Sequence, residues 1–199
     1  KDRYNIQEDL EIENYYIDPA IDYAAIAYSY SKGKISINYR FRELAYYLDK
    51  IKELSNLKDG VKFLIYHELG HFHDIDYKNQ NVNSYLEKLL IDDVEFGQVF
   101  PESEANRYAV SKLGNFIDTF SKFVALYSFL YRSRVNSTIN FYEKYLSNSN
   151  WGYPPHIYSI SSFSLTKEMK EKITTLSYSY LNQIKKHLKL SLLGGIKEI

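Results

Sequence analysis

The order of apolar and polar residues predicts a β-hairpin in the N-terminal part of the chain. From Ile35 to Phe41 every second residue is apolar or aromatic, and polar residues stand between them. A period of two places alternate side chains on opposite faces of a strand. A turn-forming segment, residues 31–34, precedes this run. We therefore expect a hairpin over residues 23–41, and we assign no element to residues 1–20.

Longer segments have the spacing of helices, in which apolar side chains recur every three or four residues. We expect helices over five such segments, with a break before the second: residues 43–54, about 61–73, 117–133, 138–147 and about 166–190. The pattern as a whole predicts an α+β fold that is mostly helical, with a small antiparallel sheet or hairpin before the helix at 61–73.

Composition narrows the classes of partner. Lys and Arg number 25 and Asp and Glu number 25, so the formal net charge is zero. A chain with this balance has no strong positive electrostatic field that would attract nucleic acid, so no nucleic-acid partner is expected. The most apolar run, Phe120–Tyr131, is too short to span a bilayer, so no membrane span is expected. We expect a cytoplasmic protein, although the start at Lys1 instead of Met leaves secretion open. Composition does not indicate the oligomeric state.

The helix expected at 61–73 contains the H-E-x-x-H arrangement, His67-Glu68-Leu69-Gly70-His71. Helical residues that are four apart lie about 40° apart around the axis. The imidazoles of His67 and His71 can then bind one metal ion from the same face, and Glu68 can take a proton from a metal-bound water. The chain has no cysteine, so any ligands are His and carboxylates, which suits hydrolytic zinc. His73 lies about 200° from His71 and faces away from the metal.

Catalytic zinc usually takes three protein ligands and leaves one position for water. The strongest candidate for the third ligand is Glu102, in a helix that opens at Pro101. Glu102 and Asn106 share one helix face, so the carboxylate can bind the metal while the Asn106 amide holds a histidine's second nitrogen. Ala105 and Ala109 would let this helix approach the His helix closely.

Other residues remain alternatives for the third ligand. Glu104 is the next candidate, and both glutamates can instead merely cap the helix N-terminus. Asp74, seven residues after the first motif histidine, returns to nearly the same helix face. His156 and His187 are the histidine alternatives, although His187 lies on a Lys-rich face. A metzincin ligand would stand six residues after the second histidine, where the chain has Tyr77, so that arrangement fails.

The two segments together resemble the gluzincin group of zinc metallopeptidases and, more narrowly, the ImmA/IrrE family. That family has an H-E-x-x-H helix, then an E-x-x-A-(N/D)-x-(F/Y)-A helix that supplies the third ligand. His67–His71 and Glu102–Ala109 match these patterns, and residues 35–39 fit the strand that the family places before the His helix. The resemblance covers roughly residues 22–115. It implies a zincin-like domain with one Zn²⁺ per chain.

We expect residues 1–199 to form a single metallopeptidase-like domain, since this length can bury a core without disulfides. Residues 22–115 would be the catalytic core. Residues 116–199 have no family signature and would be a helical extension packed on it. The sequence therefore indicates neither the substrate nor its regulation.

The expected activity is that of a zinc metalloendopeptidase, acting on a specific protein or a peptide. Zinc held by His67, His71 and Glu102 lowers the pKa of its water toward ~7. Glu68 accepts that proton as general base and passes it to the leaving amine. His156 is expected to stabilise the developing oxyanion, with Arg107 or a tyrosine as alternatives.

Functions of other classes remain open. One is a metal-binding sensor or regulatory protein on a zincin scaffold with little or no proteolysis. The intact Glu68 argues against it, because metal binding requires only the ligands. Another is a toxin-like or effector protease with a narrow substrate. The last is a structural helical domain in which the motif is accidental, and metal analysis separates it from the others.

Overall fold

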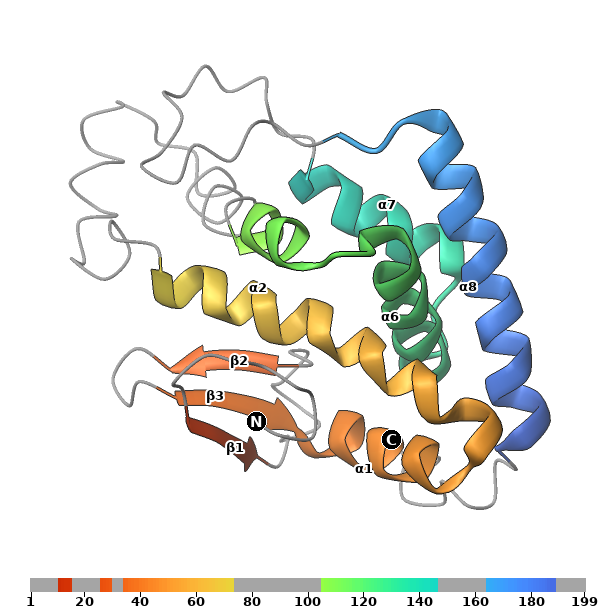
Figure 1. Cartoon of the computed structure of the whole chain (residues 1–199), viewed down its shortest axis with the longest axis horizontal. Coiled ribbons are helices and arrows are strands. Elements are labelled where there is room, and N and C mark those ends of the chain that lie inside the picture. Colours follow the sequence, from red (N-terminus) through yellow and green to blue (C-terminus); the bar gives the residue numbers. More distant parts are fainter. Residues whose placement is uncertain (1–10, 16–25, 30–33, 74–104, 147–163, 189–199) are drawn as a thin grey trace.

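A small sheet and a set of packed helices make up the described part of the chain (Figure 1). The computed structural model describes residues 11–15, 26–29, 34–73, 105–146 and 164–188, and the side chains within 40–70, 105–143 and 164–188. Most of these residues are helical, which confirms a mostly helical fold.

The sheet has the strands β1 (Glu11–Tyr15), β2 (Ile26–Ser29) and β3 (Lys34–Asn38), in the order β1-β3-β2. β2 runs antiparallel to β3, with Ile26 opposite Ile37. β1 runs parallel to β3. No element was expected in the segment that forms β1. Its Glu-Ile-Glu-Asn-Tyr sequence is largely polar, and the strand pairs through backbone hydrogen bonds to a distant partner.

The first helix begins where the hairpin was expected to end. α1 covers Tyr39–Lys50, so the prediction of a strand up to Phe41 and a helix from residue 43 is wrong. Phe41, Leu44 and Leu48 are all buried, and their spacing of three and four is that of a helix face. The alternation of apolar and polar residues continues from the strand to Phe41, but the helical spacing determines the structure here. The helix also ends at Lys50, earlier than predicted.

A 3-10 helix, η2 (Lys52–Gly60), leads directly into α2 (Val61–His73). The buried residues of η2 are Leu54, Leu57 and Gly60. They are three apart, and a 3-10 helix has three residues per turn, so they line one face. The break expected before residue 61 is therefore a change of helical pitch, while α2 has the predicted bounds. α2 lies between the sheet and a helix over residues 105–112, drawn in bright green in Figure 1.

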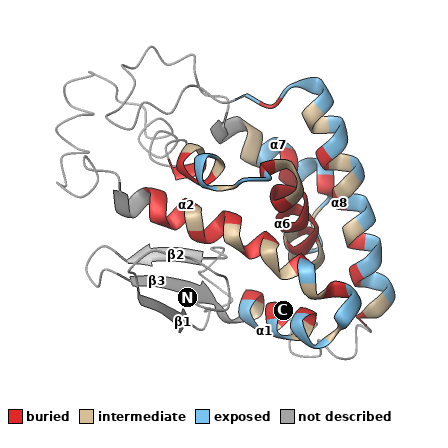
Figure 2. Ribbon diagram, viewed as in Figure 1, coloured by how far each residue is buried: buried red, intermediate tan, exposed pale blue. Residues whose placement is uncertain are grey.

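The centre of the core is an aromatic cluster around Phe63 of α2. α6 (Phe116–Tyr131) supplies Phe120 and Phe123, whose ring centroids lie 5.0 and 5.2 Å from that of Phe63. Tyr142 packs edge-on against Phe123 at 5.0 Å. α6 is buried along most of its length (Figure 2). The core is therefore continuous across the boundary predicted between the catalytic core and the extension.

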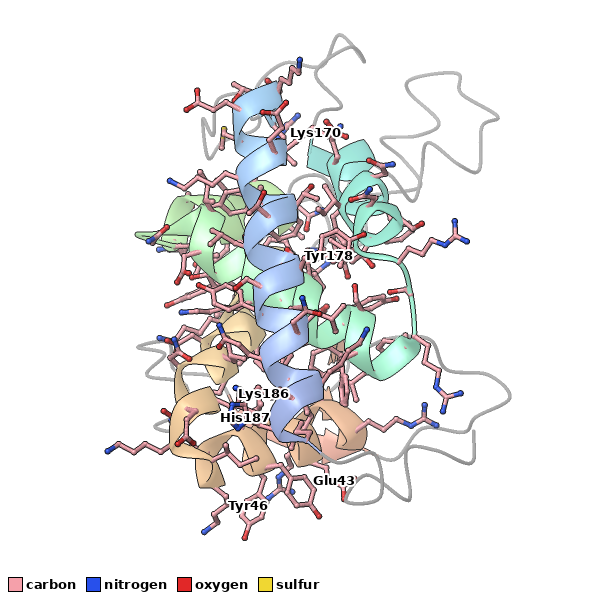
Figure 3. The ribbon with its side chains drawn as sticks, turned by 90° about the vertical axis from the view of Figure 1, so that its right-hand side faces the viewer. Glu43, Tyr46, Lys170, Tyr178, Lys186 and His187 are labelled. Atoms are coloured by element: carbon pink, nitrogen blue, oxygen red, sulfur yellow. The ribbon has the colours of Figure 1, made fainter. Side chains whose placement is uncertain are left out.

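Two further helices, α7 (Val135–Leu146) and α8 (Lys167–His187), pack against α6. α8 begins after Thr166, whose hydroxyl accepts a hydrogen bond from the backbone of the first turn. Its outer face is polar and carries Tyr178 and Lys186 (Figure 3). No helix within the described ranges combines the length and the apolar character of a membrane span.

A polar network joins α6 to α8. The Tyr180 hydroxyl donates to one carboxylate oxygen of Asp118, and Lys122 Nζ lies 2.7 Å from the other. Burial raises the pKa of Asp118. The hydrogen bonds from Lys122 and Tyr180 and the positive charge of Lys122 lower it by more, so the pKa lies below its ordinary value. Burial, then the hydrogen bond to Asp118 and the charge of that carboxylate, raise the pKa of Tyr180 to about 12. The phenol therefore remains a donor at neutral pH.

The lowered pKa of Asp118 makes its contribution to stability depend on pH. The ionised carboxylate contributes stability above its unfolded pKa of ~3.9, and this contribution is lost as the pH falls through the lower folded value. Asp118→Asn should therefore lower the free energy of unfolding at pH 7 by about 1 kcal/mol, and by less at pH 3. Urea denaturation at the two pH values measures the difference.

The exposed ion pair of Glu171 with Lys167, at 4.0 Å, provides the control. Glu171→Gln should change the free energy of unfolding little at either pH, because solvent screens exposed pairs. An effect of Asp118→Asn that is as large at pH 3 as at pH 7 would contradict the electrostatic assignment.

Candidate metal centre

Two polar side chains are buried in α2, directly after a largely apolar run, residues 61–66. His67 and Glu68 are each 7 % exposed. Leu64, Ile65 and Leu69, their neighbours along the helix, are buried as well. Much of α2 is accordingly drawn in red in Figure 2. Burying an imidazole and a carboxylate is unfavourable unless each has a hydrogen-bond partner or a bound cation. This part of α2 therefore requires specific partners.

Asn106 is the partner of His67. It stands on the helix over residues 105–112 and is 1 % exposed, and its Oδ1 lies 2.9 Å from Nδ1 of His67. An amide oxygen only accepts, so the imidazole carries its proton on Nδ1 and donates it to Asn106. A contact between the Asn106 amide and the second ring nitrogen of a motif histidine was expected from the sequence, and this hydrogen bond, donated by His67, is such a contact. The further role of Asn106 toward a metal stays a prediction.

The other ring nitrogen of His67 is left with a lone pair in the neutral ring. Nε2 lies 3.8 Å from Oε1 of Glu68, which is beyond hydrogen-bond distance. Histidines that bind metals almost always donate their second ring N–H to a carbonyl, carboxylate or water, which holds the ring in one orientation. His67 has this arrangement, and the Glu68 carboxylate lies beside the nitrogen that would bind the metal.

The helix over residues 105–112 approaches α2 closely at Gly70. A methyl group at position 70 would place its carbon 2.6 Å from Cα of Ala105 and 3.1 Å from Cβ of Tyr108. Ala105 and Ala109 are both buried. The close approach expected of this helix is present at Ala105, and the residue of α2 that it meets is Gly70.

Gly70 occupies an unspecified position of the H-E-x-x-H motif, and the motif alone assigns it no role. A signal was nevertheless available in the sequence. Glycine in a helix interior costs about 1 kcal/mol relative to alanine. A glycine there therefore often has a packing or functional reason.

Several predicted site residues fall outside what the structure describes. The backbone of His71 belongs to α2, but its side chain lies beyond the described side chains. Four others lie outside the described residues altogether: Asp74, Glu102, Glu104 and His156. Their proposed roles therefore stay predictions.

The donors that are described suit zinc. Imidazole nitrogen is a common zinc ligand, and the lone pair on Nε2 of His67 is oriented by the bond to Asn106. Within the described ranges, no three His, Asp or Glu side chains are grouped so that they could hold a metal ion. A complete site would therefore need ligands from the remainder of the chain, where His71 and Glu102 were predicted.

Comparisons with protein-family models, curated proteins and solved structures find no match to this chain. The interpretation of the site therefore rests on its residues and on the geometry of His67, Glu68 and Asn106.

Removal of the Asn106 amide should destabilise the protein. In Asn106→Ala the buried N–H of His67 loses its acceptor, so we expect the free energy of unfolding to fall by about 1–3 kcal/mol. Urea denaturation of metal-free protein measures this loss. Ser111→Ala, an exposed position on the same helix, is the control and should stay within about 0.5 kcal/mol of the unmodified chain. Equal effects of the two substitutions would show that the hydrogen bond contributes nothing.

Proposed function

We propose that this chain is a zinc-dependent metallopeptidase that hydrolyses peptide bonds in a specific protein substrate. The observation that carries the proposal is a buried histidine, oriented through Nδ1, beside a buried glutamate on the same helix. His71, one turn further along α2, and Glu102 are the proposed additional ligands. Asn106 follows Glu102 by four residues and already contacts His67, which supports the choice of Glu102.

The proposal includes a zincin-like α+β fold. α2 would be its active-site helix, with the small sheet on one side and the helix over residues 105–112 on the other (Figure 1). In such an arrangement the ligands come from two helices that pack directly on each other. The contact of Gly70 with Ala105 supports this arrangement.

Each residue of the proposed site has a distinct task in the proposed reaction. When bound, zinc would lower the pKa of a coordinated water toward ~7 and polarise the scissile carbonyl. Glu68 takes the proton of the attacking water as general base and returns it to the leaving amine as general acid. Asn106 keeps the His67 ring in the orientation and tautomer that present Nε2. His156 is the proposed group that stabilises the oxyanion.

The buried Glu68 favours catalysis over metal binding alone. A sensor that only binds metal needs the ligands, and a carboxylate at the position of Glu68 would add the unfavourable desolvation of a further charge. A hydrolase requires such a group, because water must lose a proton as it attacks. The proximity of Glu68 Oε1 to Nε2 of His67 at 3.8 Å is consistent with a base next to the metal.

Replacement of the proposed base should separate metal binding from hydrolysis. We expect Glu68→Gln to keep about one zinc per chain. Its rate of peptide cleavage should fall by about 10²–10⁴-fold or more, because the amide cannot accept the proton. His67→Ala should lose the zinc itself. Elemental analysis of protein purified without chelator and cleavage of a peptide library followed by mass spectrometry measure the two properties. Full cleavage by Glu68→Gln would exclude the assigned role.

Substitution of the acidic candidates should identify the third ligand. We expect Glu102→Ala to weaken zinc binding by more than the roughly 10- to 100-fold that loss of a supporting group causes. Glu104→Ala and Asp74→Ala are the matched controls and should retain zinc. Competition with a fluorescent chelator measures the dissociation constants. If Glu104→Ala or Asp74→Ala shows the larger loss, that residue takes the place of Glu102.

A further inference from the structure

Two of the contacts between α2 and the helix over residues 105–112 are adjacent. One is the hydrogen bond of 2.9 Å between His67 and Asn106, and the other is the approach of Gly70 to Ala105. His67 and Gly70 are three residues apart on a helix, so they lie on neighbouring turns of one face. Asn106 directly follows Ala105. The distance between the two helices at Gly70 therefore also governs the hydrogen bond.

The magnitudes show how little displacement the hydrogen bond tolerates. A methyl carbon at position 70 would lie 2.6 Å from Cα and 3.0 Å from the carbonyl oxygen of Ala105, both backbone atoms. Ordinary carbon–carbon contact is about 3.5–4.0 Å, so the helices would have to separate by about 1 Å. The same shift would lengthen a bond of 2.9 Å beyond the roughly 3.5 Å at which a hydrogen bond is lost.

We infer that Gly70 is a positioning residue for the candidate metal centre. By bringing the two backbones together, it allows Asn106 to hold His67 in the Nδ1–H tautomer. The effect of Gly70 on zinc binding rests on the proposed function. Its effect on the tautomer of His67 rests on the described contacts alone.

Gly60 provides a matched control within the same continuous helical segment. A methyl carbon there would lie 2.6 Å from the backbone nitrogen of Phe123 and 2.7 Å from the carbonyl carbon of Lys122. The steric conflict is thus as severe as at Gly70 and also involves backbone. Its partner is α6, however, and not the helix that carries Asn106. Gly114, where a methyl group would meet nothing within 4 Å, provides a second control for the general effect of alanine.

The experiment compares Gly70→Ala, Gly60→Ala and Gly114→Ala in the full chain without metal. Two-dimensional ¹H–¹⁵N spectra of the imidazole rings at pH 8 report which nitrogen of His67 carries the proton. We expect Gly70→Ala to lose the Nδ1–H signature and to weaken zinc binding about 10- to 100-fold, as the loss of a supporting hydrogen bond does. Gly60→Ala should lose a comparable share of stability but keep the signature, and keep its zinc affinity within about twofold. Gly114→Ala should match the unmodified chain.

Ala105→Ser adds one atom to the buried residue whose backbone Gly70 approaches. If Gly70→Ala does not give folded protein, this variant replaces it. We expect it to separate the two helices by less, and to weaken the Nδ1–H signature and zinc binding in the same direction. An unchanged Nδ1–H signature in the variant that folds, or an equal loss in Gly60→Ala, would overturn the inference. If the unmodified chain binds no zinc, the proposed function fails, while the spectra still decide the role of Gly70.

Discussion

The burial of His67 and Glu68 in an apolar helix is the constraint to which the rest of the described structure responds. Polar side chains removed from water are unfavourable by several kcal/mol unless they are hydrogen-bonded. The acceptor for Nδ1 of His67 comes from outside α2, from Asn106, 39 residues further along the chain. A second helix must therefore lie directly against α2 at this point, and Gly70 provides the necessary space.

The same helix is anchored at its other end by the aromatic core. Phe63 lies one turn before His67 and packs against Phe120 and Phe123 of α6. A rotation of α2 would disturb this packing and the bond to Asn106 together, so the two contacts define one orientation of the helix. A metal site or active site benefits from such support, since its geometry has to be maintained to within a fraction of an ångström. The core and the candidate site thus share one helix.

The elements differ in how far the sequence predicted them, for reasons that particular residues show. The bounds of α2 were predicted correctly because its apolar run and its motif are both local patterns. At the start of α1 two local patterns overlap, since Phe41 continues the alternation of the strand and also opens the helical series with Leu44 and Leu48. Packing decided in favour of the helix, because it buries all three side chains. β1 has no such pattern, since its pairing with β3 depends on a partner about twenty residues away.

For the site, the sequence by itself determined which residue types are available and how they are spaced. His67, Glu68 and Asn106 could be selected because metal chemistry requires particular donors at helical intervals. Only the tertiary structure decided that Asn106 contacts His67 through Nδ1, and that Gly70 is the point of closest approach. The physical reason is that spacing along one helix is a local property of the backbone. The distance between two helices depends on which side chains are small enough to let them meet, and this is a property of the packed molecule.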